Sequence, residues 1–93
     1  MRYTVVWRET ALQQLAQIWL ASADRSAVTR AAATVDRELA NDPQTKGDEY
    51  SGDRTLILSP VMWALFTVRA DDRIAEVLPV GRPGLDLPHE PAG

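Results

Sequence analysis

Few residues of this chain have side chains suited to acid–base or nucleophilic chemistry. His89 is the only histidine, and histidine is the side chain that titrates closest to neutral pH without help from its surroundings. It lies between Pro88 and Pro91, in a segment with little to fix its position, whereas catalytic proton transfer needs fixed geometry. The absence of cysteine excludes disulfides, zinc–thiolate sites and thiol catalysis. A solvated side chain is therefore the favoured interpretation of His89.

The other polar candidates lie in segments that read as turns and loops. Asp71 and Asp72 are adjacent acids, but no third or fourth ligand lies near them in the sequence. A turn is therefore favoured over a metal site. Lys46 and Tyr50 belong to a polar segment and are expected to be solvated. The sequence predicts neither a metal nor a cofactor.

The charge balance argues against an extended nucleic-acid surface. The chain has 10 basic and 13 acidic residues, for a formal net charge of −3. Nucleic-acid binding draws most of its affinity from neutralised phosphates, so any such role must rest on a local basic patch. No apolar run approaches the roughly 20 residues that span a bilayer. The first apolar run is also too short for a signal peptide, so we expect a cytoplasmic protein with no membrane contact.

Two periodicities divide the first half of the chain. Residues 3–8 alternate and are rich in β-branched and aromatic side chains, which predicts a strand. From Glu9 the apolar spacing becomes helical. Asp24 or Ser26 can cap a second helix, which must end before Pro43. The short connection makes the two helices an antiparallel hairpin.

The second half predicts a polar loop followed by three strands. The loop covers residues 43–53, which contain two glycines and a proline. The strands are residues 54–58, 62–70 and 73–80. Their short connections imply an antiparallel meander, in which Pro79 must lie at an edge or a bulge. Residues 83–93 read as a flexible tail rich in proline and glycine.

The order β-α-α-β-β-β predicts one two-layer α+β domain, with the helical hairpin packed on one face of an antiparallel sheet. Eight apolar residues should form most of the core. They are Leu12, Leu15, Trp19, Val35, Leu39, Leu56, Leu65 and Phe66. The favoured role of the three tryptophans is also core packing, and any exposed one would mark a surface for a protein partner.

Several short phrases in this order resemble the RelE/ParE superfamily of bacterial toxin–antitoxin toxins. The run Tyr3–Trp7, followed by Glu9–Leu15, looks like that family's opening strand and first helix. The phrase Leu39–Pro43 is similar to its second helix end, and Gly52–Arg54 to its GxR phrase. The run Glu76–Arg82 looks like its final strand and V-G-[KR] ending. The resemblance covers residues 3–82, so residues 1–82 are expected to be a toxin domain.

The resemblance implies a growth-inhibiting toxin, of the kind linked to plasmid stabilisation, held inactive by a cognate antitoxin. For the RelE branch it implies ribosome-dependent mRNA cleavage, in which a ribose 2′-OH attacks the neighbouring phosphate. That chemistry needs a base, an acid and cations for the developing charge. For the ParE branch it implies inhibition of DNA gyrase without that catalytic set. The resemblance assigns phosphate binding to Arg82 and, as a second candidate, to Arg54.

The sequence departs from the nuclease pattern at three places. The run Val61–Leu65 stands where an arginine is usual, Thr55–Leu58 has no lysine, and the tail has no tyrosine. These differences favour a toxin that acts by binding, or a degenerate toxin, with the mRNA endonuclease as the alternative. The expected partners are the antitoxin and, as a target, either the ribosome with its mRNA or DNA gyrase. A homo-oligomer stays open.

Overall fold

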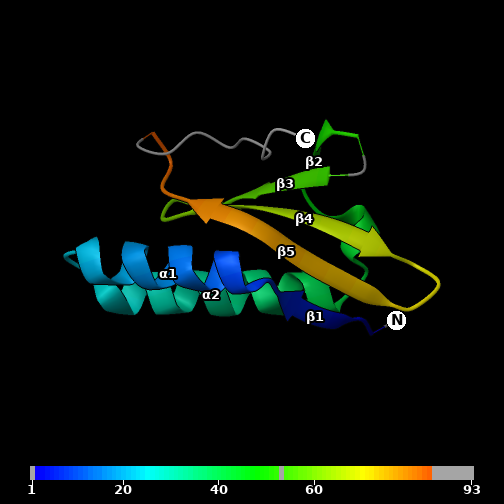
Figure 1. The fold of residues 1–93 in the computed structure, drawn as a ribbon, viewed down its shortest axis with the longest axis horizontal. Helices are drawn as coiled ribbons and strands as arrows, with labels where there is room; N and C mark the ends of the chain where they lie inside the picture. Colours follow the sequence, from blue (N-terminus) through cyan, green and yellow to red (C-terminus); the bar gives the residue numbers. More distant parts are fainter. Residues whose placement is uncertain (1, 53, 85–93) are drawn as a thin grey trace.

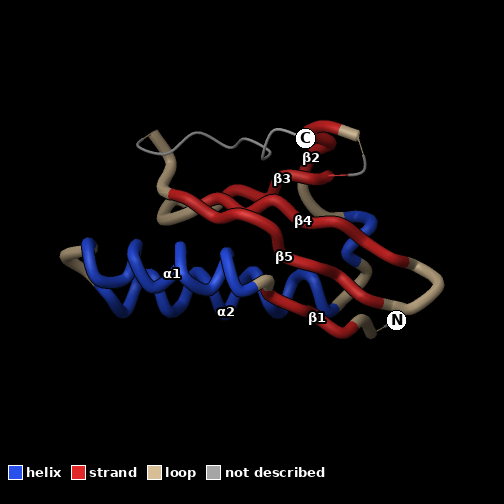
Figure 2. Tube along the Cα trace, in the orientation of Figure 1, coloured by secondary structure: helices blue, strands red, loops and turns tan. Residues whose placement is uncertain are grey.

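A computed structural model describes residues 2–52 and 54–84, which form a two-layer α+β fold (Figure 1). Within these ranges, two helices cover one face of a five-stranded sheet (Figure 2). In chain order the elements are β1 (Thr4–Trp7), α1 (Glu9–Ala21), α2 (Arg25–Ala40), the 3-10 helix η1 (Pro43–Thr45), β2 (Asp48–Ser51), β3 (Arg54–Leu58), β4 (Trp63–Arg69) and β5 (Ile74–Gly81). The strands are arranged β1-β5-β4-β3-β2. The predicted fold class is confirmed.

Capping and turn signals in the sequence place the element ends. Asp24 is the N-cap of α2, where its Oδ1 accepts a hydrogen bond from the Ala27 N–H at 3.0 Å. The helix ends at Ala40, before Pro43 as predicted. Between β4 and β5, the Arg73 N–H donates to the Ala70 carbonyl at 3.2 Å. This hydrogen bond closes the turn that was predicted at Asp71 and Asp72.

The sheet is mixed, whereas the sequence predicted an antiparallel one. Strands β2 to β5 do form the predicted antiparallel meander. Strand β1 instead pairs in parallel with β5, with Thr4 opposite Ile74 and Trp7 opposite Val77. The short-connection argument does not apply to β1, because both helices and three strands separate it from β5 in the chain.

The segment expected to be a polar loop, residues 43–53, contains η1 and strand β2. Strand β2 pairs with β3 through its backbone, with Asp48 opposite Leu56 and Glu49 opposite Thr55. Its polar side chains gave no strand pattern. Gly47 precedes it at a φ of 70°, and a Cβ there would lie 2.5 Å from the Leu56 carbonyl oxygen, so only glycine fits.

Pro79 lies at a bulge in β5, as its missing N–H predicted. Ala64 pairs with Val80 and Phe66 with Val77, so Leu78 and Pro79 share the place opposite a single residue of β4. The neighbouring Val80 N–H donates to Gln14 Oε1 of α1 at 2.9 Å, which ties the first helix to this end of β5.

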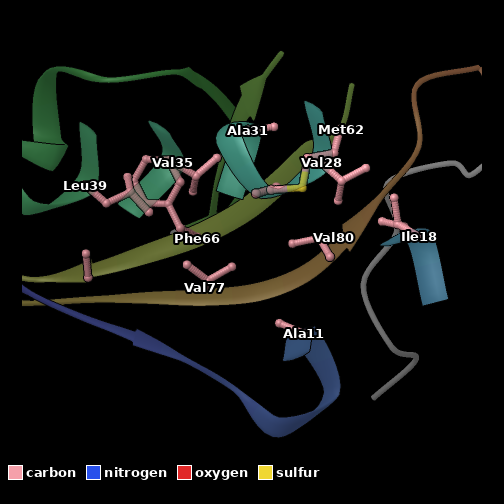
Figure 3. Packing of buried hydrophobic residues seen from close by; sticks show 12 residues of the cluster. Ala11, Ile18, Val28, Ala31, Val35, Leu39, Met62, Phe66, Val77 and Val80 are labelled. Atoms are coloured by element: carbon pink, nitrogen blue, oxygen red, sulfur yellow. The ribbon is translucent and has the colours of Figure 1, made fainter. Parts of the chain in front are cut away.

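The main core lies between the helices and the sheet (Figure 3). Val35, Leu39 and Phe66 are buried there as predicted. The prediction was wrong for Leu12 and Trp19, which are 51% and 39% exposed. The residues of α1 that are fully buried are Ala11 and Ile18 instead. The side of α1 that faces the sheet is therefore the one with Ala11 and Ile18, and Leu12 and Trp19 lie toward solvent.

A second, smaller cluster lies on the opposite face of the sheet. Trp63, Leu65 and Leu78 are buried in it, and Leu56 packs against them half-buried. Leu65 is therefore a core residue as predicted, but of this cluster. Leu15, also predicted for the core, is half-buried at the edge of the main cluster. No helix in the described residues is long and apolar enough to cross a membrane.

Candidate functional site

An apolar groove lies between the two helices. Its lining is Leu12, Leu15, Ala16 and Trp19 from α1, with Val28, Thr29 and Ala32 from α2, and its volume is about 340 Å³. The hollow exists because small side chains on both helices stand between larger ones. Leu20, next to Trp19 in the chain, is also exposed, at 58%.

Arg25 organises the end of this groove near the helix connection. Its guanidinium carbon lies 4.7 Å from the centroid of the Trp19 ring, a cation–π contact. Its Nε donates to the Trp19 carbonyl at 3.2 Å and its Nη2 to the Leu20 carbonyl at 3.3 Å. A cation on these last carbonyls of α1 satisfies the helix end and fixes the indole. The groove is thus a preformed apolar surface with one aromatic wall, suited to the apolar side of a partner helix.

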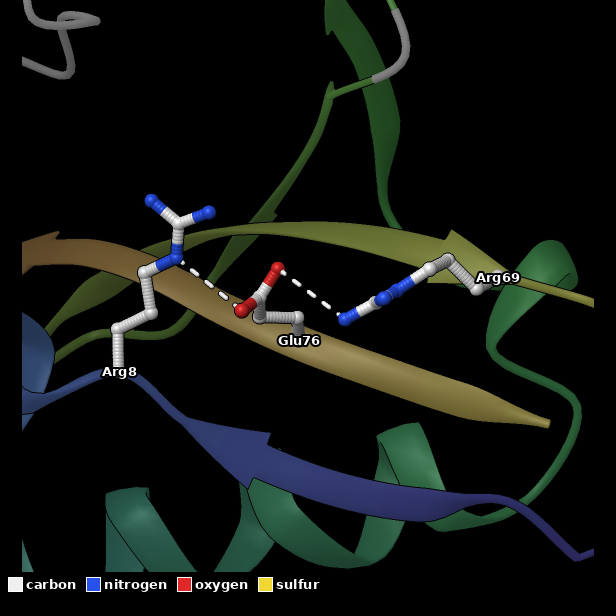
Figure 4. A network of polar contacts seen from close by, with 3 residues as sticks. All are labelled: Arg8, Arg69 and Glu76. Carbon is white, nitrogen blue, oxygen red and sulfur yellow. Dashed lines mark hydrogen bonds and ion pairs between the residues drawn. The ribbon is translucent and has the colours of Figure 1, made fainter. Parts of the chain in front are cut away.

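The face of the sheet without helices carries a polar network (Figure 4). Ala75 and Val77 point into the helix-side core, so Glu76 between them lies on this open face. The Arg8 Nε donates to Glu76 Oε2 at 3.1 Å, and the Arg69 Nη2 lies 3.9 Å from Oε1. Residues from β4, β5 and the end of β1 therefore meet at one carboxylate.

The network leaves positive charge at the surface. Two arginines share one carboxylate, and both arginine side chains are 56% exposed while that of Glu76 is 18% exposed. Exposed ion pairs of this kind contribute about 0–1 kcal/mol to stability. A role in recognition therefore accounts for the cluster better than a role in folding.

The strand register separates the two predicted site residues, Arg54 and Arg82, along the strand direction of the sheet. Arg54 begins β3 one residue before the Thr55–Phe66 pair, and Arg82 follows the Gly81–Trp63 pair. Their backbones thus align with positions of β4 about five residues apart, which is roughly 16 Å at 3.3 Å per residue. The fold does not bring the two backbone positions together.

The remaining polar candidates do not gather into a site. Lys46 pairs with Glu38, with Nζ 3.1 Å from Oε2, and Tyr50 is exposed on β2. Asp71 and Asp72 lie in the exposed turn after β4. Across residues 2–52 and 54–84, no three acids or histidines are grouped so as to hold a metal ion. His89 and most of the predicted tail lie outside the described residues.

Both the groove and the arginine network were missed by the sequence reasoning. The helical spacing of Leu12, Leu15 and Trp19 predicts a stripe that packs in the core, and not a groove. The arginine network could have been suspected from charged residues at alternate positions of the strands. That these residues meet follows only from the order of β1, β5 and β4 in the sheet.

The comparisons with known proteins find likeness in structure alone. No family model matches the sequence, and no curated protein matches it. A chain in the RelBE2 toxin–antitoxin complex from Mycobacterium tuberculosis superimposes with a TM-score of 0.70 at 14% identity, covering 88% of this chain and 92% of that one. A chain in the chromosomal ParDE TA system from P. aeruginosa gives 0.67 at 15% identity, covering 87% and 96%.

The isolated RelE toxin from E. coli is a third similar structure, with a TM-score of 0.61 at 14% identity over 86% of this chain and 83% of that one. At these identities the likeness concerns the arrangement of elements and not individual side chains. This chain therefore shares the fold of these RelBE2, ParDE and RelE structures.

Proposed function

We propose that this chain is the toxin of a bacterial toxin–antitoxin pair, a cytoplasmic growth inhibitor neutralised by a cognate antitoxin. The observation that carries the proposal is the fold, which matches RelE and ParE structures over most of the described residues. Two of those structures are themselves toxin–antitoxin complexes or systems. Residues 1–82 would form the toxin domain.

The proposed mode of action is binding to a cellular target without cutting RNA. Cleavage through a ribose 2′-OH needs cations and proton-transfer groups beside the phosphate. On the face of the sheet without helices, the cluster of buried side chains is instead apolar and consists of Trp63, Leu65 and Leu78. The backbones of Arg54 and Arg82 also lie about five residues apart along the strand direction of the sheet. These features support a ParE-like inhibitor or a degenerate toxin, with DNA gyrase, which the ParE resemblance implies, as the proposed target.

The groove between α1 and α2 is the proposed seat of the antitoxin. An amphipathic helix that carries apolar side chains at helical spacing would cover Leu12 and Trp19, two exposed large apolar residues. Exposed tryptophan is typical of the residues that dominate protein interfaces. Covering them would also stabilise a small domain, because a ligand that binds only the folded state raises its stability by mass action.

Co-expression tests the proposal. Induction of this chain alone is expected to stop growth of a bacterial host, and co-expression of a short open reading frame adjoining its gene is expected to restore growth. The growth rate of induced cultures, with and without that second gene, is the measurement. A chain with Phe66→Ala serves as the control for the burden of expression, because it should be strongly destabilised. Unimpeded growth on induction of the folded chain would contradict the proposal.

A further inference from the structure

We infer that the open face of the sheet is a second contact for a protein partner, where Arg8 and Arg69 bind an acidic segment. The inference rests on the proposed function only in taking that partner to be the antitoxin. The site itself depends on Arg8, Arg69, Glu76 and the neighbouring Val6.

The geometry leaves the arginine donors available. Arg8 contacts Glu76 through Nε alone, at 3.1 Å, and its two Nη atoms point away from the carboxylate (Figure 4). The paired N–H groups of a guanidinium match the two oxygens of a carboxylate. Arg69 approaches Glu76 only to 3.9 Å, beyond hydrogen-bond distance, so its donors are also free to bind a closer anion. In residues 2–52 and 54–84 neither guanidinium has a further ion pair.

Glu76 lies between the two arginines (Figure 4). It is fixed within β5 and mostly covered, whereas both arginine side chains extend into solvent. The hydrogen bond from Arg8 to Glu76 orders one guanidinium, and the carboxylate attracts the other, which lowers the ordering cost when an anion arrives. Two arginines and one glutamate leave one unit of positive charge for that anion to neutralise.

The surroundings favour a protein segment over a nucleic acid. Val6 pairs in register with Glu76 on the neighbouring strand, and it is 41% exposed. An apolar side chain beside the arginines suits a segment that carries both acidic and apolar residues. A nucleic acid presents a phosphate at every nucleotide and needs a row of cations, and the net charge of −3 opposes such a polyanion.

The experiment uses the whole chain and a short synthetic peptide in which glutamate and valine alternate. Arginine Nε–Hε signals of the ¹⁵N-labelled protein are recorded by NMR at low ionic strength, where exposed charges are least screened. The Arg8 and Arg69 signals are expected to shift to saturation with this peptide. A peptide with glutamine in place of glutamate is expected to leave them unchanged.

Variants assign the binding to these two side chains. The double change Arg8→Gln/Arg69→Gln is expected to weaken peptide binding roughly tenfold, since it removes two exposed charge contacts. The matched control is Arg30→Gln, which removes an exposed cation from α2 and should leave the affinity unchanged. All three positions are exposed, so circular dichroism should report an unaltered fold.

Three outcomes would overturn the inference: no saturable shift, equal weakening by Arg30→Gln, or tighter binding of an oligouridylate with the same dependence on Arg8 and Arg69. The last would assign the face to nucleic acid. Because the titration contains no antitoxin and no cells, its failure is distinguishable from failure of the growth test. A chain without toxicity could still bind the peptide, and a toxic chain could fail to bind it.

Discussion

Replacing Phe66 with alanine is expected to lower the free energy of unfolding by about 3–5 kcal/mol. Phe66 is fully buried on β4 and belongs to the cluster that joins the sheet to α2, where Val35 and Leu39 are also buried (Figure 3). Its removal takes away both the buried ring and the contacts around it. Domains of this size have a total stability of about 5–15 kcal/mol, so the change should remove a large part of it.

Thermal unfolding followed by circular dichroism measures this effect. At about 4–8 °C for each kcal/mol, the melting temperature should fall by at least 12 °C or so. Leu58→Ala is the matched control: Leu58 lies on the adjacent strand but is 62% exposed, so its loss should change stability by less than about 0.5 kcal/mol. A Phe66→Ala protein that melts with the wild type would mean that the two layers do not pack as described.

Placing a charge in the groove is expected to weaken antitoxin binding about a hundredfold. In Leu12→Glu, a carboxylate would stand where a partner helix buries apolar side chains, and the loss of a central contact costs about 2–4 kcal/mol. Half of the Leu12 side chain is already exposed in the isolated chain, so the fold should tolerate the change. Titration of the purified antitoxin into each variant by calorimetry gives the two affinities.

Leu58→Glu is the control for this second prediction, because it introduces the same charge at an exposed leucine outside the groove. Leu58 pairs with Trp63, six residues from Arg69 along β4, so the added charge also lies far from the arginines on the helix-free face. The affinity of Leu58→Glu should equal that of the wild type. In cells, Leu12→Glu should remain toxic and escape rescue by the antitoxin. Equal affinities for the wild type and Leu12→Glu would exclude the groove as the antitoxin site.

Local signals in the sequence were enough to predict most of the fold. The alternation near the N-terminus, the cap at Asp24 and the stop before Pro43 each depend on neighbours in the chain, and each is found in the structure. Pro79 predicted an edge or a bulge, because proline has no N–H to donate to a neighbouring strand, and the structure has a bulge there. These features follow from the backbone chemistry of single residues.

The features that were missed depend on contacts between distant segments. Strand β2 is polar and is defined by its pairing with β3, so its side chains carried no strand signal. On α1, both the stripe of Leu12, Leu15 and Trp19 and the stripe of Ala11 and Ile18 are apolar. Hydrophobicity alone favoured the stripe with the larger total apolar surface, whereas packing against the sheet buries the stripe of Ala11 and Ile18.

The candidate site was harder to predict than the fold. Arg54 and Arg82 were chosen because the family resemblance assigns them a role, and no geometric argument joined them. Arg8, Arg69 and Glu76 come together only because β5 lies between β1 and β4, an order that no local pattern specifies. Site prediction therefore fails where topology, and not sequence spacing, brings charges together.

We propose that this chain inhibits growth by binding a target and does not cut mRNA. Primer extension on a reporter mRNA, in cells arrested by the induced chain, tests it most directly. The account predicts full-length mRNA in arrested cells, for the wild type and for Arg54→Ala/Arg82→Ala alike. Cleavage within the coding region that accompanies arrest, and is lost in the Arg54→Ala/Arg82→Ala double variant, would contradict it and show a nuclease.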